Sequence, residues 1–437
     1  MNEDLAQLPS ELADQFTEPL LRFFRIEAMA GAILLGCVVV ALSFANSKWS
    51  PQYFALWEMR IGLSLGDIEF SRSLQHWIND GLMTLFFFVV ALELKREITL
   101  GELRDPRLTM LPLAGAIGGM IIPVGLYLLL VGGGPSAAGW GTVMSTDTAF
   151  VIGCLALLGR HVPESLRLFL LTLAIFDDIA AILVVAISYG DALQWIPLAM
   201  GGLGVAVIAG IGWFGIRSIP LYFTVGLGVW VALDASGIHA TLTGVILGLM
   251  APAHSWVSDD RLHAIFNRVV AYPPGKHWGG DTAGRRDLQR AGVAAREVLS
   301  PIERLEIILH PWIAFAVMPL FALANAGVTF VPDRFDSALA MAIFVGFVVG
   351  KPVGIVVLSA LAVKLRVARR PHDLPWRILT AGSTLAGIGF TMALFIAGLA
   401  FSSELLGSVK VGVLAASLAS AIAGMLGLIC LSTSNRR

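Results

Sequence analysis

The sequence predicts an all-α polytopic membrane protein, and three observations indicate this fold class. Hydrophobic residues make up 57% of the 437 residues and charged residues only 14%, whereas about a quarter of the residues of a soluble domain are charged. The mean hydropathy is +0.79. Apolar segments close to the ~20 residues needed to cross a bilayer recur along the whole chain. The composition therefore indicates a membrane protein, and the net charge of -1 gives no indication of nucleic-acid binding.

Twelve membrane spans are predicted from these apolar segments. Residues 1–20 then form a cytoplasmic N-terminal segment, residues 21–431 the twelve-span domain, and residues 432–437 a cytoplasmic tail. The spans are placed at 21–45, 76–96, 108–132, 139–158, 166–189, 195–216, 219–235, 238–252, 306–328, 338–363, 378–402 and 409–431.

The basic residues predict the orientation. Loops on the N-terminal side of the membrane carry 24 of the 30 Lys and Arg, and the opposite loops carry five. Because cytoplasmic loops are enriched in Lys and Arg, both termini are expected in the cytoplasm, which requires an even number of spans. The five outer basic residues are Lys48, Arg60, Arg72, Arg334 and Lys410.

Two stretches outside the spans have distinct patterns. Residues 58–71, "EMRIGLSLGDIEFS", alternate apolar and polar residues around Gly66-Asp67, which predicts an extracytoplasmic β-hairpin. Residues 253–305, with "YPPGKHWGGDTAGRR" in the middle, form a long cytoplasmic connection that is polar and rich in turn residues.

Charged residues inside the spans point to transport. Asp177 and Asp178 lie in span five, Asp147 in span four and Lys351 near the centre of span ten. Each charge at mid-bilayer costs roughly 2.5–3.5 kcal/mol on insertion scales, so the default reading is an ion or proton pathway. A structural salt bridge between spans five and ten is the alternative, but one lysine cannot neutralise three acids.

Two spans are predicted to be interrupted at the same depth. Span four reads "GTVMSTDTAFVIG" around Asp147, and span eleven reads "AGSTLAGIGFTMALF", with Gly387 and Gly389 at its centre. Irregular backbone at this depth is tolerated where it lines a cavity, although small residues also allow close helix packing. Asp147 would suit the exposed helix ends of the first interruption and Lys351 those of the second. Spans three to five and ten to twelve enter from opposite sides, so they predict an inverted repeat.

The sequence also resembles a known family, the NhaA-type sodium/proton antiporters. The motifs that carry the resemblance follow one another along almost the whole chain. They are "INDGLMTLFFFVVALELKRE" (78–97), "STDTAFVIGCLALLG" (145–159), "IFDDIAAI" (175–182), "GIHATLTGVILG" (237–248), "RLEIILHPW" (304–312), "FALANAGV" (321–328), "GKPVGI" (350–355) and "AGIGFTMALFIAG" (386–398).

The resemblance implies a twelve-span fold with crossed broken helices that exchanges cytoplasmic Na⁺ or Li⁺ for external protons in the bacterial inner membrane. It implies Asp178 as the principal cation ligand, with Asp177 beside it and able to pair with Lys351. Asp147 and Lys351 would compensate the helix ends. The connection before Ser300 is longer than expected for the family.

Further roles come from the same resemblance. The 58–71 hairpin is similar to the element that pairs in the family's dimers, so a homodimer is expected. The response to pH is assigned to Glu306 and His239, together with Glu93 and Arg96 of the cytoplasmic funnel.

The chemistry of the residues agrees with a hard cation. Asp carboxylates and Thr hydroxyls supply the oxygen ligands that Na⁺ prefers, and no Cys or His cluster offers a transition-metal site, so no cofactor is expected. Burial and a neighbouring carboxylate disfavour the charged form of an aspartate, so a proton can occupy the group that a cation would occupy. Thr146 and Asp80 are candidates to line the site, although Asp80 suits a solvated helix end equally well.

Two other functions remain open from the sequence. A Na⁺-coupled symporter with the same fold would use the same residues. An intramembrane aspartyl protease would need two acids from different helices, such as Asp147 and Asp178, but leaves Lys351 unexplained.

Overall fold

The computed structural model describes residues 27–65, 68–99, 101, 106–159, 162–190, 193–216, 218–253, 257–270, 282–329 and 335–434. The predicted N-terminal segment 1–20 lies outside these residues, as do the last three residues of the predicted tail. The chain divides into two compact units. Unit 1 comprises Met1–Leu82, Arg107–Tyr189 and Pro311–Arg437, and unit 2 comprises Met83–Pro106 and Gly190–His310.

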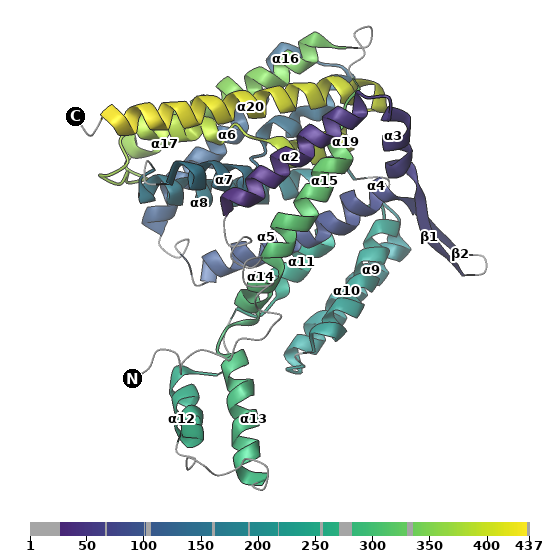
Figure 1. The fold of residues 1–437 in the computed structure, drawn as a ribbon, viewed down its shortest axis with the longest axis vertical. Helices are drawn as coiled ribbons and strands as arrows, with labels where there is room; N and C mark the ends of the chain where they lie inside the picture. The colour runs from purple at the N-terminus through teal and green to yellow at the C-terminus, as the bar shows by residue number, and fades with distance from the viewer. Residues whose placement is uncertain are drawn as a thin grey trace. The chain divides into compact units, whose positions relative to one another are not determined.

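Unit 1 is helical apart from one two-stranded ribbon (Figure 1). Several of its helices are short or interrupted, and three short segments (η2, η6 and η8) are π-helices. Its elements are α2 (Glu27–Ala45), α3 (Ser50–Glu58), β1 (Arg60–Leu65), β2 (Ile68–Ser73), α4 (Leu74–His76), η2 (Trp77–Leu82), α6 (Pro106–Val131), the 3₁₀ helix η4 (Pro135–Met144), α7 (Thr148–Leu158), α8 (Glu164–Ser188), η6 (Ile313–Val317), α15 (Met318–Asn325), α16 (Ser337–Val345), η8 (Gly346–Gly350), α17 (Lys351–Lys364), α18 (Trp376–Leu385), α19 (Phe390–Ala400) and α20 (Ser403–Ser434).

Unit 2 consists of helices that pack in pairs. Gly244 and Gly248 of α11 face α5 so closely that a Cβ at either position would fall within 3 Å of α5. Helices α9 and α10 lie side by side (Figure 1) around Ile208, Val229 and Leu233. The elements are α5 (Met83–Thr99), α9 (Trp195–Trp213), α10 (Ile219–Ala235), α11 (Leu242–Met250), α12 (Asp259–Val270), α13 (Thr282–Glu297) and α14 (Pro301–Trp312), whose last two residues belong to unit 1.

Not every one of the twelve predicted spans is a long apolar helix within the described residues. Eight described helices are long and apolar enough to cross a membrane, and the number is ten if each of two bent helix pairs is one span. The predicted spans 219–235 and 238–252 are α10 and α11, helices of 17 and 9 residues. Both are shorter than the ~20 residues of a full span, because the chain turns between Ser236 and Thr241.

The predicted β-hairpin is confirmed, with its strands slightly later in the chain. Strands β1 and β2 pair antiparallel, with Arg60 opposite Ser73 and Leu65 opposite Ile68. The Trp77 indole N–H, at the start of η2, donates to the carbonyl oxygen of Ile61 at 2.9 Å. This bond fixes the base of the ribbon to the helix that follows it.

The connection 253–305, which the sequence predicts to be polar and rich in turns, also has regular structure in its described residues. It contains two helices, α12 and α13, which pack against each other as an antiparallel pair (Figure 1). The backbone N–H of Val257 donates to Glu297 O, and Arg304 pairs with the Glu297 carboxylate at 3.0 Å. The turn-rich letters 271–281 lie outside the described residues.

Lys351 of unit 1 lies next to a close crossing of two helices. Helices α6 and α17 touch at Gly118 and Gly354, where a Cβ on either glycine would overlap the carbonyl oxygen of the other. Small residues at such a crossing let two helix backbones approach closely in a membrane. One helical turn away, Lys351 begins α17 with its side chain fully buried.

Candidate functional site

The two adjacent aspartates lie inside helix α8. Asp177 is 0% exposed and Asp178 is 3% exposed. Adjacent residues of an α-helix point about 100° apart, so the two carboxylates meet different neighbours. Each carboxylate accepts a hydrogen bond from a threonine of interrupted span four.

Span four is interrupted where the sequence predicts it. The 3₁₀ helix η4 ends at Met144, residues Ser145–Asp147 are non-helical, and α7 begins at Thr148. Asp147 is the N-cap of α7, and its Oδ1 accepts a hydrogen bond from the backbone N–H of Phe150 at 3.0 Å. A carboxylate at this position satisfies a free N–H group and complements the positive end of the helix.

Span eleven is interrupted as well, and its interruption contacts that of span four. Helices α18 and α19 are bent by 50° across residues 386–389. The Asp147 N–H donates to Ile388 O at 2.6 Å, while Asp147 Oδ2 accepts from the Thr391 N–H at 2.9 Å and from the Thr391 hydroxyl at 2.5 Å. Asp147 therefore caps the N-terminal ends of both α7 and α19.

Lys351 joins the interrupted span four to the aspartates. Its Nζ donates to Met144 O, at the end of η4, at 2.6 Å and lies 3.1 Å from Asp177 Oδ2. The sequence assigned Lys351 to the interruption of span eleven; the structure places it at the end of η4 in span four instead. The reason is the carbonyl end of η4, because the last carbonyls of a helix are negative and attract a cation.

Threonine hydroxyls complete the surroundings of both aspartates. The Thr146 hydroxyl donates to Asp177 Oδ2 at 2.5 Å, and the Thr148 hydroxyl donates to Asp178 Oδ2 at 3.1 Å. Asp177 Oδ1 is buried and accepts no hydrogen bond within the described part of the chain. The group thus presents carboxylate and hydroxyl oxygens, the ligands of a hard monovalent cation.

This buried group contains both acidic and basic side chains. Asp177 and Asp178 together carry two negative charges when ionised, and Lys351 supplies one positive charge. Asp147 is met by helix N-termini and a hydroxyl rather than by a cationic side chain. Charges inside a membrane are costly unless they are neutralised, so these buried carboxylates are candidates to bind a cation or a proton.

Comparison with known proteins identifies the family. The family model described as Na⁺/H⁺ antiporter 1 matches residues 21–428. The chain belongs to the Na⁺/H⁺ antiporter 1 family. It is 65% identical to the Na⁺/H⁺ antiporter NhaA of Rhizobium meliloti over the whole of both chains. It is also 54% identical to the Na⁺/H⁺ antiporter NhaA 2 of Acidiphilium cryptum, covering 98% of this chain and 96% of that one, and 49% identical to the Na⁺/H⁺ antiporter NhaA 2 of Vibrio vulnificus, covering 97% and 95%.

The alignment with this antiporter of Rhizobium meliloti runs through residues 253–305, because it covers both chains completely. The connection that is longer than expected for the antiporter family is therefore matched in at least this relative. The residues that form α12 and α13 thus have counterparts in that relative.

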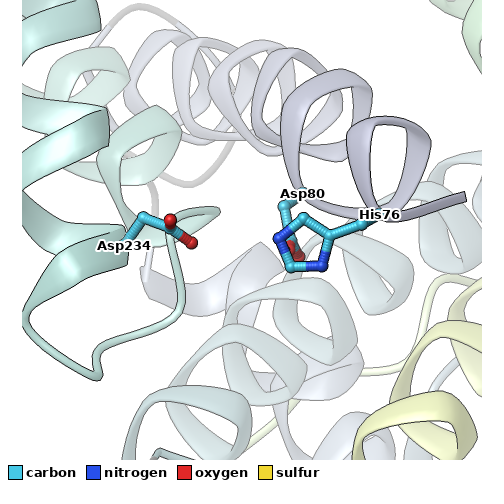
Figure 2. A group of neighbouring side chains, drawn as sticks. All are labelled: His76, Asp80 and Asp234. Atoms are coloured by element: carbon cyan, nitrogen blue, oxygen red, sulfur yellow. The ribbon is translucent and has the colours of Figure 1, made fainter. Parts of the chain in front are cut away.

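Asp80, a candidate to line the site, lies in the π-helical segment η2. Its Oδ2 is 2.9 Å from His76 Nε2, one helical turn earlier, and Figure 2 shows the two side chains together. Asp234, labelled in the same view, belongs to unit 2 near the end of α10. Sequence reasoning did not select His76, although its spacing of four residues from Asp80 on a helix is the signal that finds such a pair.

The residues that the antiporter resemblance links to pH response lie in unit 2. Arg96 Nη1 is 2.6 Å from Glu306 Oε1, and Arg96 Nη2 is 3.0 Å from Glu97 Oε1. Glu306 Oε2 is buried without a hydrogen-bond partner in the described residues. Glu93 is partly buried, one helical turn before Arg96, and His239 is partly buried in the turn between α10 and α11.

Several residues in contact with these groups are not among the candidates that the sequence predicts. Glu97 shares Arg96 with Glu306, and its spacing from Glu93 on one helix is a usable signal. The Lys95 ammonium donates to Leu249 O and Ala251 O at the end of α11, both at 2.6 Å. No pattern in the sequence predicts that contact, since it depends on how α5 and α11 pack.

Proposed function

We propose that this protein exchanges cytoplasmic Na⁺ or Li⁺ for external H⁺ at Asp177 and Asp178, and so serves sodium and pH homeostasis. The observation that carries the proposal is a buried pair of adjacent aspartates beside the Lys351 ammonium, each of which accepts from a threonine hydroxyl of an interrupted helix. The relatives named as Na⁺/H⁺ antiporters support it.

The exchange follows from competition for carboxylates. When Lys351 pairs with Asp177, Asp178 retains a negative charge, which either a Na⁺ ion or a proton neutralises. Thr148, which donates to Asp178 Oδ2, supplies a further oxygen ligand for a cation. Because a charged, empty site is costly within the membrane, the site crosses loaded with one ion or the other. Binding of Na⁺ on one side then displaces protons, which couples the two flows.

Lys351 has two tasks in this scheme. Its ammonium neutralises Asp177, and it also satisfies the Met144 carbonyl at the end of η4. Asp147 has the corresponding task at the N-terminal ends of α7 and α19. We therefore assign helix-end compensation to these two residues and direct cation contact to Asp177 and Asp178, with Thr146 lining the site.

The alternatives find less support. In an aspartyl protease, Asp147 and Asp178 would share a proton and activate a water molecule. Both Asp147 oxygens instead accept hydrogen bonds from helix N-terminal groups and from the Thr391 hydroxyl, which favours a structural role. A Na⁺-coupled symporter would use the same ion site, and the antiporter names of the relatives argue against it.

For the fold as a whole we propose the twelve-span arrangement with inverted repeats over spans three to five and ten to twelve. The interruptions in the middle span of each triplet, and the contact between them through Asp147 and Ile388, support it. The short helices α10 and α11 would then cross as shortened spans. The protein would lie in the bacterial inner membrane with both termini in the cytoplasm, as the distribution of Lys and Arg favours.

We also propose a homodimer that forms through the hairpin of β1 and β2. A two-stranded ribbon is marginally stable alone, and its outer edges offer unpaired backbone groups to another strand. Pairing of two ribbons across a two-fold axis satisfies these groups. The response to pH would belong to Glu93, Arg96, His239 and Glu306 of unit 2, with the Arg96–Glu306 ion pair at its centre.

The test uses everted membrane vesicles with an acidified lumen and a pH-sensitive dye. Addition of Na⁺ should dequench the dye in vesicles with the native protein, and Asp178→Asn should abolish the signal, because an amide cannot be discharged by a proton. A matched control is Asp336→Asn, since Asp336 caps α16 outside this site. Na⁺-dependent dequenching that persists in a folded Asp178→Asn protein would refute the proposal. A requirement for an organic co-substrate would favour the symporter.

A further inference from the structure

The first half of interrupted span four, helix η4, is only weakly stabilised by its own backbone hydrogen bonds. Helix η4 is a 3₁₀ helix of ten residues, whereas 3₁₀ runs longer than about four residues are uncommon because their hydrogen bonds have poorer geometry. Gly132, Gly133 and Gly134 precede it with φ angles of 70°, 110° and 83°, and no atom lies within 4 Å of their added Cβ positions. The non-helical residues 145–147 follow it. The position of η4 therefore depends on neighbouring elements.

Two tyrosine hydroxyls hold this segment. Tyr127 of α6 is fully buried and donates to the carbonyl oxygen of Ser136 at 2.5 Å. Tyr189, directly after α8, donates to Ala138 O at 2.9 Å and accepts from the Gly141 N–H at 3.3 Å. The two hydroxyls thus provide hydrogen bonds to the first and middle parts of η4.

The far end of η4 contacts the candidate ion site. Met144, its last residue, accepts a hydrogen bond from Lys351 Nζ at 2.6 Å, and the same ammonium lies 3.1 Å from Asp177 Oδ2. Met144 O and Asp177 therefore share one ammonium group. A shift of η4 changes how that ammonium is divided between them.

We infer that Tyr127 and Tyr189 are positioning residues for the cation site: they fix η4 so that Met144 O holds the Lys351 ammonium and limits its pairing with Asp177. This inference rests on the proposed function, in which Na⁺ binds next to Asp177. Neither tyrosine touches the ion. Both act through η4 and Lys351.

Loss of either hydroxyl has a definite direction. With η4 less constrained, Met144 O holds the ammonium less often, and Lys351 pairs more closely with Asp177. A cation must then compete with a tighter ion pair, so the apparent KM for Na⁺ rises. The loss of one neutral hydrogen bond corresponds to about a two- to tenfold change in an equilibrium constant.

The experiment uses the purified full-length protein in liposomes. Tyr189→Phe, Tyr127→Phe and the double variant each keep the aromatic ring and remove a hydroxyl. Tyr222→Phe is the matched control, because Tyr222 lies in α10 of unit 2 and its hydroxyl makes no hydrogen bond within the described residues. For each variant, the apparent KM for Na⁺ and the maximal rate are measured at two pH values, and thermal unfolding is recorded with and without Na⁺.

We expect the KM for Na⁺ to rise about two- to tenfold in each single variant, with a smaller change in the maximal rate and with the control unchanged. The stabilisation by a fixed Na⁺ concentration should fall in parallel. Folded tyrosine variants with an unchanged or lower KM would overturn the inference, as would a loss of thermal stability alone. If Tyr127→Phe does not fold, the partly exposed Tyr189 carries the test. Failure of the proposed function itself is seen separately, as Na⁺ exchange that survives Asp178→Asn.

Discussion

Replacement of Lys351 by alanine tests the central ion pair most directly. The side chain is fully buried and contributes two contacts, to Asp177 Oδ2 at 3.1 Å and to Met144 O at 2.6 Å. Removal of one partner from a buried ion pair costs about 3–5 kcal/mol, because the other charge stays buried and uncompensated. We therefore expect Lys351→Ala to lower the free energy of unfolding by on the order of 3 kcal/mol or more near neutral pH.

The pH dependence of this cost has a fixed sign. At acid pH Asp177 can take up a proton, so it no longer needs the ammonium, and the difference between Lys351→Ala and the native protein should shrink. The assay is thermal unfolding of the purified protein in detergent at several pH values. Lys351→Arg, which keeps the positive charge, is the control and should retain both stability and exchange.

A double-mutant cycle separates the contribution of the Asp177–Lys351 ion pair to stability from the other effects of replacing Lys351. Asp177→Asn combined with Lys351→Met removes both charges, and such replacements of a whole buried pair are often close to neutral. The double variant should therefore be more stable than the sum of the two single changes implies. Lys351→Ala as stable as the native protein, at neutral pH, would refute the structural role of the ion pair and leave the lysine free to carry a proton.

Three further predictions follow from the site and the ribbon. Competition at one carboxylate predicts that, at pH well below the pKa of the site, the KM for Na⁺ rises about tenfold per pH unit on acidification, or up to about a hundredfold if two protons must leave. A pH-independent KM with a steeply pH-dependent maximal rate would contradict it. Asp147→Asn should impair exchange less than Asp178→Asn in the same liposome assay, because the single amide oxygen still accepts from one of the two helix ends, at Phe150 or at Thr391; equal loss would argue for direct ion contact. Deletion of residues 60–73 should yield monomers in detergent that still exchange ions, and inactive but folded monomers would count against a role in assembly alone.

The location of the site was largely predictable from composition. Acids in apolar segments are so costly that Asp147, Asp177, Asp178 and Lys351 stood out without any structure. Glycine and hydroxyl residues likewise marked both interruptions, at 145–147 and 386–389. These signals are local, since each can be read within one span.

The contacts that organise the site were not predictable in the same way. Hydropathy does not say that Lys351 meets Met144, or that Tyr127 and Tyr189 reach into η4, because these contacts depend on how separate helices pack. Hydropathy also placed a span at 238–252, whereas α11 covers only Leu242–Met250. Helices α12 and α13 were missed because turn-rich letters between them dominate the pattern.

The carboxylate of Asp147 has a mechanical consequence. One oxygen accepts a hydrogen bond from the backbone of α7, and the other accepts from the backbone N–H and the hydroxyl of Thr391 in α19. These two half-helices are far apart in the sequence, but hydrogen bonds to a single side chain hold them together. A displacement of α7 along its axis must drag α19 with it or break two hydrogen bonds to a buried charge. The pair is therefore expected to move as one rigid piece during transport.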